Sequence, residues 1–322
     1  MFRNIPIVYN ADQLIDRAIK KSKKVQIYDR DIRYKNKKTI IAKTESFSSS
    51  IINNLDNYVK NFPSIDNIHK FYQEIIEIKF DKNKLKKSLG AIKWARDTSN
   101  MIYSKQSKSL TKSGNIEFLK QKQKEIYGRI SSVLKQIDND LRFVAEVQIL
   151  LKDLPDIKDI SSIVIAGYPN VGKSSLLKQV SSAKPMIAQY PFTTKEIHVG
   201  HIEFTDKFIK SRIQIIDTPG LLDRAFSKRN EIEKQAIAAL KYIADIIVFI
   251  IDPTETCGYS LEEQEGLLNN VKKIFKDKKI IIVENKSDMI HSKSKNIKIS
   301  CSSGEGIKEL IDFLILQIKQ IS

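Results

Sequence analysis

The sequence predicts two successive domains: an all-α helical bundle over residues 1–155, and an α/β domain over residues 156–322 with a mostly parallel six-stranded sheet and helices on both faces. Three observations lead to this fold class. Apolar residues recur at helical spacing in the first half, short β-branched runs alternate with helical patterns in the second, and Leu154-Pro155-Asp156 separates the two patterns. At 322 residues, the chain is long enough to bury a core in each domain.

Helical patterns fill most of the first half. The clearest covers residues 116–151, where apolar side chains fall at spacings of three and four, or sums of these, and so share one face. Lysines and an arginine occupy the opposite face, as in a bundle with a solvated outer surface. Residues 29–50 are polar and rich in serine and lysine, and we expect them to contain a loop. The other expected helices cover residues 11–24, 51–60, 65–80 and 84–109.

The second half contains short β-branched runs that are apolar almost throughout, which is typical of strands buried on both faces of a sheet. Helical patterns separate these runs, and this alternation predicts mainly parallel strands joined by helices. The expected strands cover residues 162–166, 213–217, 246–252, 279–284 and 296–300, and the expected helices follow Gly172 or lie around residues 231–243, 261–275 and 305–321.

The positive charge is concentrated in the first half of the chain. The formal net charge is +17. Residues 1–160 hold 32 lysines and arginines against 19 aspartates and glutamates, whereas residues 161–322 hold 23 against 19. A basic half beside a nearly balanced half favours a polyanionic partner for the basic one, although a lysine-rich solvated surface would give the same count.

The cysteine and apolar content bound the cellular setting. Two cysteines, Cys257 and Cys301, provide no disulfide framework or metal cluster, and they fit a reducing cytosol. The N-terminus lacks the long apolar stretch of a signal peptide, and the longest apolar runs, such as residues 246–251, are too short to span a bilayer. We therefore expect a cytoplasmic, monomeric protein without a membrane partner.

A complete Walker A pattern follows the first expected strand, in the strand–loop–helix context that it requires. Its glycines let the backbone wrap around phosphate, so that successive N–H groups form an anion nest at a helix N-terminus. Lys173 is expected to reach the β- and γ-phosphates, and Ser174 to ligate Mg²⁺. The nucleotide-binding residues expected in this loop are Gly167, Tyr168, Pro169, Asn170, Val171, Gly172, Lys173, Ser174 and Ser175.

Two further segments complete a phosphate and Mg²⁺ site. Asp217 ends an expected strand and begins Asp-Thr-Pro-Gly, where a carboxylate can hold Mg²⁺ through water and the Gly220 N–H can sense the γ-phosphate. Between the Walker loop and Asp217 lies a loop with two adjacent threonines, Thr193 and Thr194. A threonine here would ligate Mg²⁺ and follow the γ-phosphate as a switch, and both positions qualify.

The base is identified by Asn285-Lys286-Ser287-Asp288, which follows another apolar run. The Asp288 carboxylate can accept hydrogen bonds from N1–H and the exocyclic amine of guanine, whereas adenine offers no such pair of donors. This residue therefore selects GTP and GDP and argues against an ATPase. The Lys286 stem is expected over the base plane, and Ser300-Cys301-Ser302 is expected to supply a backbone N–H to the guanine carbonyl.

Taken in order, these motifs resemble those of the translation-factor-related GTPases with a P-loop α/β fold. The segment Tyr-Pro-Phe-Thr-Thr at 190–194 is similar to the Obg-like group. Within that group, the resemblance is to the nucleolar GTP-binding (Nog) family, and it covers roughly residues 160–320. It is carried by the Walker loop, by Asp-Thr-Pro-Gly-Leu-Leu-Asp at 217–223, by Arg-Asn-Glu-Ile-Glu at 229–233 and by Asp-Pro-Thr-Glu-Thr-Cys-Gly-Tyr at 252–259.

The resemblance implies a GTPase that acts in assembly of the large ribosomal subunit. Its implied partners are the subunit precursor, rRNA and ribosomal proteins, and it implies Thr194 as the Mg²⁺ ligand. The helical half is similar in size and character to the N-terminal domain of the Nog family. Because the sequence stops just after the GTPase domain, it resembles a compact archaeal form.

Catalytic power is expected to be low in the isolated protein. Leu221 stands where Ras-like enzymes have a glutamine that orients the attacking water. We expect catalysis to depend on Lys173, Thr194, Gly220 and Asn170, with Asn170 at the position that coordinates potassium in some related GTPases. Such an ion would offset developing charge as an arginine finger does. A cis-acting Arg224 or Arg229 is the alternative.

Two histidines and three aromatic residues are further candidates for function. His198 and His201 would lie on opposite faces of a strand, so no metal site is expected beyond Mg²⁺. Trp94, Tyr103 and Tyr127 lie among lysines, a mixture that suits RNA, but we expect them in the helical core and the lysines on the RNA. An alternative function is an Obg-like regulatory GTPase that acts on protein partners in signalling or stress.

Overall fold

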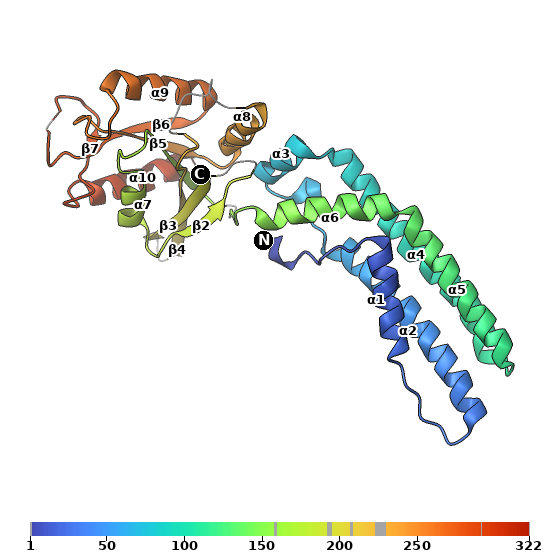
Figure 1. Cartoon of the computed structure of the whole chain (residues 1–322). Helices are drawn as coiled ribbons and strands as arrows, with labels where there is room; N and C mark the ends of the chain where they lie inside the picture. The colour runs from blue at the N-terminus through green and yellow to red at the C-terminus, as the bar shows by residue number, and fades with distance from the viewer. Residues whose placement is uncertain are drawn as a thin grey trace. The chain divides into compact units, whose positions relative to one another are not determined.

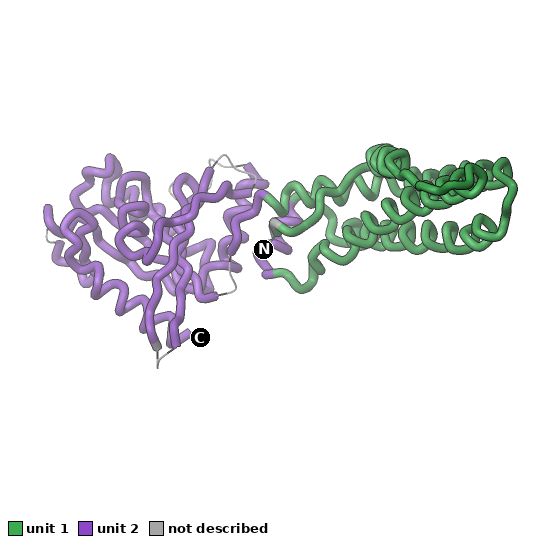
Figure 2. The backbone as a smooth tube through the Cα atoms, turned by 90° about the horizontal axis from the view of Figure 1, so that it is seen from below, with its two compact units in different colours: residues 1–68, 79–152 green, residues 69–78, 153–322 purple. Residues whose placement is uncertain are grey.

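The computed structural model describes residues 2–157, 160–191, 195–206, 209–222, 230–290 and 292–321. The chain folds into two units: residues 1–68 with 79–152 form one, and residues 69–78 with 153–322 form the other (Figure 2). The first unit is helical and the second is α/β, so the predicted fold class is confirmed. The boundary at residues 155/156 remains our proposed division of the sequence.

The helical unit is a bundle of long helices that lie side by side (Figure 1). Its core contains wholly buried side chains from four of these helices, including Phe47, Leu85, Ile92, Ile130 and Leu141. The helices of this unit are α1 (Ala11–Lys23), α2 (Ile32–Asn61), α4 (Lys82–Lys112), α5 (Ile116–Gln136) and α6 (Asp138–Asp153), with 3₁₀ turns at Phe2–Asn4 and Ile65–Asn67.

The loop expected within residues 29–50 is wrong for most of that segment, because α2 begins at Ile32. The Asp31 carboxylate caps the helix by accepting hydrogen bonds from the Arg33 and Tyr34 amides. Inside the helix, the Thr44 hydroxyl donates to the Ile40 carbonyl at 2.7 Å. Threonine and serine can enter a helix when their hydroxyls bond in this way to the preceding turn. A polar composition therefore did not exclude a helix here.

The single helix expected over residues 116–151 is two helices, α5 and α6, separated at Ile137. The Ile137 amide donates to the Leu134 carbonyl in a tightened last turn of α5. Asp138 then accepts hydrogen bonds from the Ala11 amide at 2.8 Å and the Arg142 guanidinium at 2.6 Å. Buried residues continue at helical spacing across the break, which is why the apolar pattern did not reveal it.

The α/β unit contains a seven-stranded sheet of order β2-β3-β4-β1-β5-β6-β7, one strand more than expected. Strands β4, β1, β5, β6 and β7 are parallel, and β2 and β3 extend the β4 side in antiparallel fashion. Strand β2 is short and mostly exposed, so it lacks the apolar run that marks a central strand. The strands are β1 (Ser162–Ala166), β2 (Met186–Gln189), β3 (Glu196–Asp206), β4 (Ile209–Asp217), β5 (Ile246–Ile251), β6 (Lys279–Glu284) and β7 (Ile297–Lys298).

Helices cover both faces of this sheet (Figure 1). Leu177 of α7 and Leu310 and Leu314 of α10 join one buried cluster with Ile165 and Val248 of the strands. Helix α9 covers the other face, with buried Leu267 and Val271. Their bounds are Lys173–Val180 for α7, Glu231–Ala238 for α8, Leu261–Ile274 for α9 and Ile307–Ile321 for α10, and a 3₁₀ helix, η4, covers Ala239–Tyr242.

Helix α3 (Lys70–Lys79) lies between α2 and α4 in the sequence but packs within the α/β unit. Its Phe71, Tyr72, Ile75 and Ile76 side chains are wholly buried. The Tyr72 hydroxyl donates to the Pro155 carbonyl at 2.8 Å and accepts from the Ile157 amide at 2.8 Å. The backbone therefore passes between the two units at three points along the sequence.

No helix within the described ranges is both long enough and apolar enough to cross a bilayer.

Candidate nucleotide-binding site

The loop between β1 and α7 has the backbone that a phosphate-binding loop needs. Gly167 and Gly172 have φ of 141° and 107°, which side chains rarely allow. A Cβ atom on Gly167 would lie 2.6 Å from the Ile250 carbonyl oxygen, and one on Gly172 would lie 2.1 Å from Asn285 Nδ2. Only glycine fits at either position. Asn170, with φ of 62°, is exposed on the turn between them.

The Lys173 side chain lies inside this loop and is 6% exposed. Its Nζ donates to the Gly167 carbonyl at 2.9 Å and to the Tyr168 carbonyl at 2.6 Å. The ammonium group is thus held across the loop, where it can exchange carbonyl partners for phosphate oxygens. A pocket of about 470 Å³ opens beside it, lined by Pro169, Asn170, Gly172, Lys173, Ser174, Ser175 and Pro219.

Ser174, which lines this pocket, is in contact with Asp217. The Ser174 hydroxyl donates to Asp217 Oδ2 at 2.6 Å. Asp217 is wholly buried, and its Oδ1 has no hydrogen-bond partner among the described residues. Burial raises the pKa of this carboxyl, whereas the Ser174 hydrogen bond and the positive charge of Lys173 lower it. An orphaned carboxylate oxygen beside a hydroxyl is a donor set that Mg²⁺ and its waters would satisfy, so these residues fit the ion.

Asn285 joins the phosphate loop to the loops that follow β6 and β7. Its side-chain amide is buried, donates to the Val171 carbonyl at 2.8 Å and accepts from the Cys301 amide at 3.0 Å. The Cys301 N–H is therefore used within the protein. Three segments distant in sequence, at residues 171, 285 and 301, are held together by one side chain.

Asp288 and the Ser300–Ser302 segment lie together, as a guanine site requires. The Ser302 hydroxyl donates to Asp288 Oδ2 at 2.9 Å, and the Ser300 and Ser302 hydroxyls are 2.9 Å apart. Hydrogen bonds from Ser300 and Ser302 lower the pKa of the exposed Asp288 carboxyl. It is therefore an ionised acceptor at neutral pH, held in place by two hydroxyl groups.

Two family models match the chain: "NOG1 N-terminal helical domain" over residues 2–158, and "Nucleolar GTP-binding protein 1 (NOG1)" over residues 231–288. The chain belongs to the NOG1 family of GTP-binding proteins. The match over residues 2–158 also assigns to this family the helical half, whose sequence motifs are the less specific ones.

This NOG1-family chain covers most of the length of one relative and only about a third of the length of another. An uncharacterized protein of Methanocaldococcus jannaschii is 39% identical over 90% of this chain and 81% of its own length. Nucleolar GTP-binding protein 1 of Drosophila melanogaster is 35% identical over 73% of this chain but only 36% of its own length. A solved structure of a Plasmodium falciparum protein described as nucleolar GTP-binding protein 1 is 37% identical, covering 51% of this chain and 89% of that one, with a TM-score of 0.43.

Asp252 belongs to this site, although the sequence motifs predict no role for it. It follows β5 and is wholly buried. Its Oδ2 accepts from Lys286 Nζ at 2.5 Å, and Lys286 Nζ also lies 2.6 Å from the Thr256 hydroxyl. Burial alone would raise the pKa of the Asp252 carboxyl, but hydrogen bonds from Lys286 and Thr254 lower it below its usual value. The sequence feature that could have indicated a role for Asp252 is its position at the carboxyl end of a central strand.

The Lys286 ammonium is therefore fixed by the loop after β5, with the Lys286 backbone at φ 64°. The same loop contacts the phosphate loop through Tyr259, whose ring stacks on that of Tyr168 with centroids 4.1 Å apart. The expected position of the Lys286 stem over the base remains a proposal.

The expected switch residues Thr193 and Thr194 lie outside the described residues, as do Arg224 and Arg229. Tyr190, just before them, is 1% exposed and donates its hydroxyl to the Ala236 carbonyl of α8 at 2.7 Å. Its ring lies 6.1 Å from that of Phe71 in α3. Tyr190 thus connects this loop to two helices.

The residues after Asp217 also have defined positions. Gly220 has φ of 74°, and the aliphatic part of Lys195 passes over it, so that a Cβ there would lie 2.6 Å from Lys195 Cδ. The Leu221 side chain is wholly buried. No polar group is presented from the Leu221 position to an attacking water. His198 Nδ1 lies 3.6 Å from Asp217 Oδ2, a neighbour set by the register of β3 and β4.

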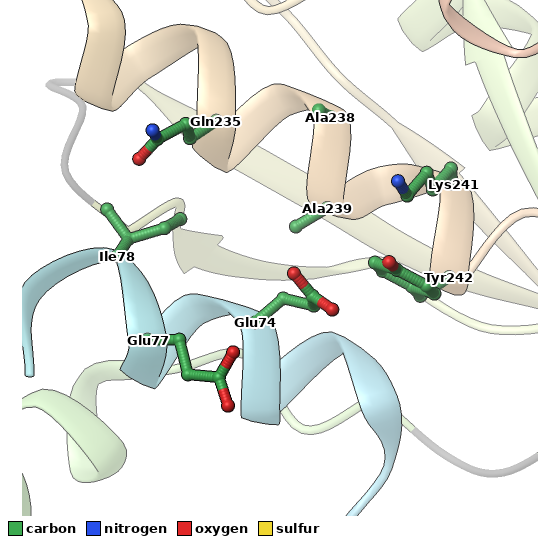
Figure 3. Close-up of a pocket in the computed structure, with 8 residues that line it drawn as sticks. All are labelled: Glu74, Glu77, Ile78, Gln235, Ala238, Ala239, Lys241 and Tyr242. Atoms are coloured by element: carbon green, nitrogen blue, oxygen red, sulfur yellow. The ribbon is translucent and has the colours of Figure 1, made fainter. Parts of the chain in front are cut away.

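A second pocket of the α/β unit lies between α3 and the α8–η4 segment, with a volume of about 280 Å³ (Figure 3). Glu74 and Glu77 stand on its α3 side, and Figure 3 shows the Glu74 carboxylate in the space between the helices. Lys241 and Tyr242 belong to the opposite side. This pocket adjoins α8, the helix whose Ala236 carbonyl accepts the hydrogen bond from Tyr190.

The aromatic side chains of the helical unit do not all lie in its core. Tyr103 and Tyr127 are partly buried, and Tyr127 stacks on Phe47 with ring centroids 3.9 Å apart. Trp94, however, is 47% exposed, so the expectation that it belongs to the core is wrong. Apolar residues recur on α4 at Leu85, Ile92 and Ala95, and Trp94 falls outside that stripe.

Proposed function

We propose that this chain is a GTP-hydrolysing switch that acts in assembly of the large ribosomal subunit, and that its basic helical unit contacts rRNA. The observation that carries the nucleotide part is the grouping of Lys173, Ser174 and Asp217 beside Asn285 and Asp288. The excess of lysine and arginine in the first half supports the RNA part. The names of the eukaryotic relatives include the word nucleolar, which supports a ribosomal role.

Each side chain has a distinct task in the proposed reaction. Lys173 would hold the β- and γ-phosphates, and Asp288 would hold the guanine base. Ser174, Thr194 and, through water, Asp217 would hold Mg²⁺, which neutralises charge that develops on the phosphates. The Gly220 N–H would follow the γ-phosphate.

Hydrolysis by the isolated protein is expected to be slow, because the buried Leu221 cannot orient water. A ribosomal partner would then complete the site. Potassium held by Asn170 is a second source of charge, since this exposed asparagine lies in the mouth of the phosphate loop. Both forms of stimulation belong to the proposal.

The experiment that tests the assembly role is sedimentation of cell extract on a gradient, with the protein detected in each fraction. Migration with large-subunit precursors, in an amount that changes between GTP and GDP, is the expected result. A pool that stays free of ribosomal particles in both nucleotides would contradict the assembly role. The same extract after ribonuclease treatment tests whether RNA mediates the association.

A second function, regulation of protein partners in a cytoplasmic signalling or stress response, is favoured by one observation. The pocket between α3 and the α8–η4 segment carries Glu74 and Glu77 on its α3 side, in a chain whose formal net charge is +17. A lysine or arginine side chain of a protein partner would complement these two carboxylates, next to the helix that Tyr190 of the proposed switch loop contacts. Loss of a captured partner from a Glu74→Gln, Glu77→Gln variant, with sedimentation unchanged, would favour this second function.

A further inference from the structure

The outer face of α4 carries a line of exposed residues that the helical core does not use. Lys87, Gly90, Trp94, Met101, Lys105 and Lys108 follow one another at spacings of 3, 4, 7, 4 and 3 residues, which places them on one face of the helix. All six are exposed, and Trp94 and Met101 each remain 47% exposed. The buried residues of α4, such as Leu85, Ile92 and Ala95, lie on the opposite side. We call these six residues the α4 stripe.

Trp94 is the most unusual member of the α4 stripe. An indole that is half exposed is uncommon in a folded protein, because burial of a tryptophan ring is strongly favourable. Within the described ranges, the Trp94 ring has no hydrogen bond, stacking partner or cation above it. One turn earlier, a Cβ on Gly90 would meet no atom within 4 Å. The helix surface one turn before the indole is therefore unobstructed, and a flat ring could reach the exposed part of the indole.

The charges along the α4 stripe are positive and available. Lys87, Lys105 and Lys108 form no ion pair with any described residue. Asp97 lies on the same side of the helix, but its carboxylate is already engaged by Arg96 Nη2 at 2.7 Å. At about 1.5 Å of rise per residue, the stripe is about 32 Å long, with lysines on both sides of the indole. This arrangement complements an extended polyanion.

We propose that the α4 stripe is a docking surface for single-stranded RNA, in which Trp94 stacks on an unpaired base and Lys87, Lys105 and Lys108 contact the flanking phosphates. The inference rests on the proposed RNA contact of the helical unit and names the residues that make it. A stacked base and phosphates on both sides are the two features by which proteins hold RNA strands without reading a duplex. An acidic protein segment would satisfy the lysines but would leave the open indole face without a planar partner.

The experiment uses the fluorescence of Trp94, which is the single tryptophan of the chain. The full-length protein is titrated with a single-stranded oligoadenylate of about 12 nucleotides, a length in the range that such sites cover. Stacking of adenine on the indole quenches its emission, and the titration gives the affinity. A duplex RNA of the same length serves as the comparison, and it is expected to bind through charge with little quenching.

Variants separate stacking from charge. Trp94→Ala is expected to weaken oligoadenylate binding about tenfold, and Trp94→Phe to retain most of the affinity, measured by competition or anisotropy. The double variant Lys105→Gln, Lys108→Gln is expected to flatten the dependence of log affinity on log salt by about 0.7 for each phosphate that the protein no longer binds. Because Trp94 is exposed and distant in sequence from the nucleotide site, its variants should keep the wild-type unfolding temperature and GTP hydrolysis rate.

Each outcome is decisive for the α4 stripe. Salt-dependent binding of oligoadenylate without quenching, and with Trp94→Ala equal to wild type, would overturn the stripe but leave the proposed RNA contact in place. Absence of binding to both RNAs at low salt would overturn both. Quenching by polyglutamate but not by oligoadenylate would assign the surface to an acidic protein partner and so refute the proposal.

Discussion

Replacing Asp252 by asparagine tests whether the loop after β5 fixes Lys286 and thereby the base site. The two carboxylate oxygens of Asp252 accept hydrogen bonds from different donors. Oδ1 accepts from the Thr254 amide at 3.0 Å, and Oδ2 accepts from the Cys257 amide at 2.9 Å and from Lys286 Nζ at 2.5 Å. An asparagine has one oxygen, so in either orientation its NH₂ group faces a backbone N–H. In one of the two orientations, it also faces the Lys286 ammonium.

These contacts determine how much the free energy of unfolding should fall in Asp252→Asn. A buried donor left without an acceptor costs about 1–3 kcal/mol, and loss of the charge partner of Lys286 adds to this. Because the Lys286 side chain is 23% exposed, water compensates part of the second cost. We expect a loss of about 2–4 kcal/mol in the free energy of unfolding. For a unit of this size, that lowers the unfolding temperature by about 5–15 °C.

The assay is thermal unfolding with and without saturating GDP, followed by titration of GDP at a temperature where the variant is folded. Affinity for GDP is expected to fall about tenfold, equivalent to about 1.4 kcal/mol, because Lys286 loses its fixed position beside Asp288. Thr256→Val gives a graded comparison: it removes only the exposed hydroxyl that contacts Lys286 and Asp252, so it should cost less than about 1 kcal/mol. An Asp252→Asn protein with wild-type unfolding temperature and GDP affinity would refute the role assigned to this loop.

Three further predictions concern the nucleotide site. Asp288→Asn should weaken GDP binding at least about 100-fold and should improve binding of xanthosine diphosphate, because the ring carbonyl of xanthine matches an amide donor. Competition between the two nucleotides measures this change. An unchanged preference for GDP would contradict guanine selection by Asp288. Ser174→Ala should raise the Mg²⁺ concentration for half-maximal GTP hydrolysis by at least about tenfold without unfolding the protein. If this concentration is the same in the variant and the wild type, Ser174 is not a Mg²⁺ ligand. GTP hydrolysis should be faster in potassium than in sodium, and Asn170→Ala should abolish that difference; equal wild-type rates in the two salts would remove potassium from the mechanism.

The central strands and the phosphate loop could be predicted because local chemistry dictates them. Gly167 and Gly172 occupy backbone conformations that exclude other residues, and the strand before them is buried on both faces. The edge strands of the sheet are harder to predict from sequence than its central strands. Strand β2 is exposed at three of its four residues, so its sequence carries little information about burial.

The features that the sequence did not reveal depend on contacts between distant segments. Asp252 becomes a site residue only because β5 and β6 are adjacent and bring it to Lys286. The residue type of Trp94 predicts a position in the core, whereas its place on α4 relative to Ile92 and Ala95 puts it outside the core. Helix α3 has an apolar face that fits a bundle as well as it fits the α/β unit, and periodicity cannot choose between them.

The placement of α3 has a consequence for how the chain folds during its synthesis. Phe71 and Ile75 leave the ribosome long before the residues against which they pack, since Tyr190 follows Phe71 by 119 positions. At about 5–20 residues per second, this apolar helix waits roughly 6–24 s for its partners. The α/β unit therefore begins with a segment from the first half of the chain and is completed only after the second half is translated, whereas all residues of the helical unit lie in the first half. A fragment that ends at the proposed boundary after residue 155 would contain α3 but not most of the α/β unit in which α3 packs. The four buried side chains of α3 would then lose residues that cover them.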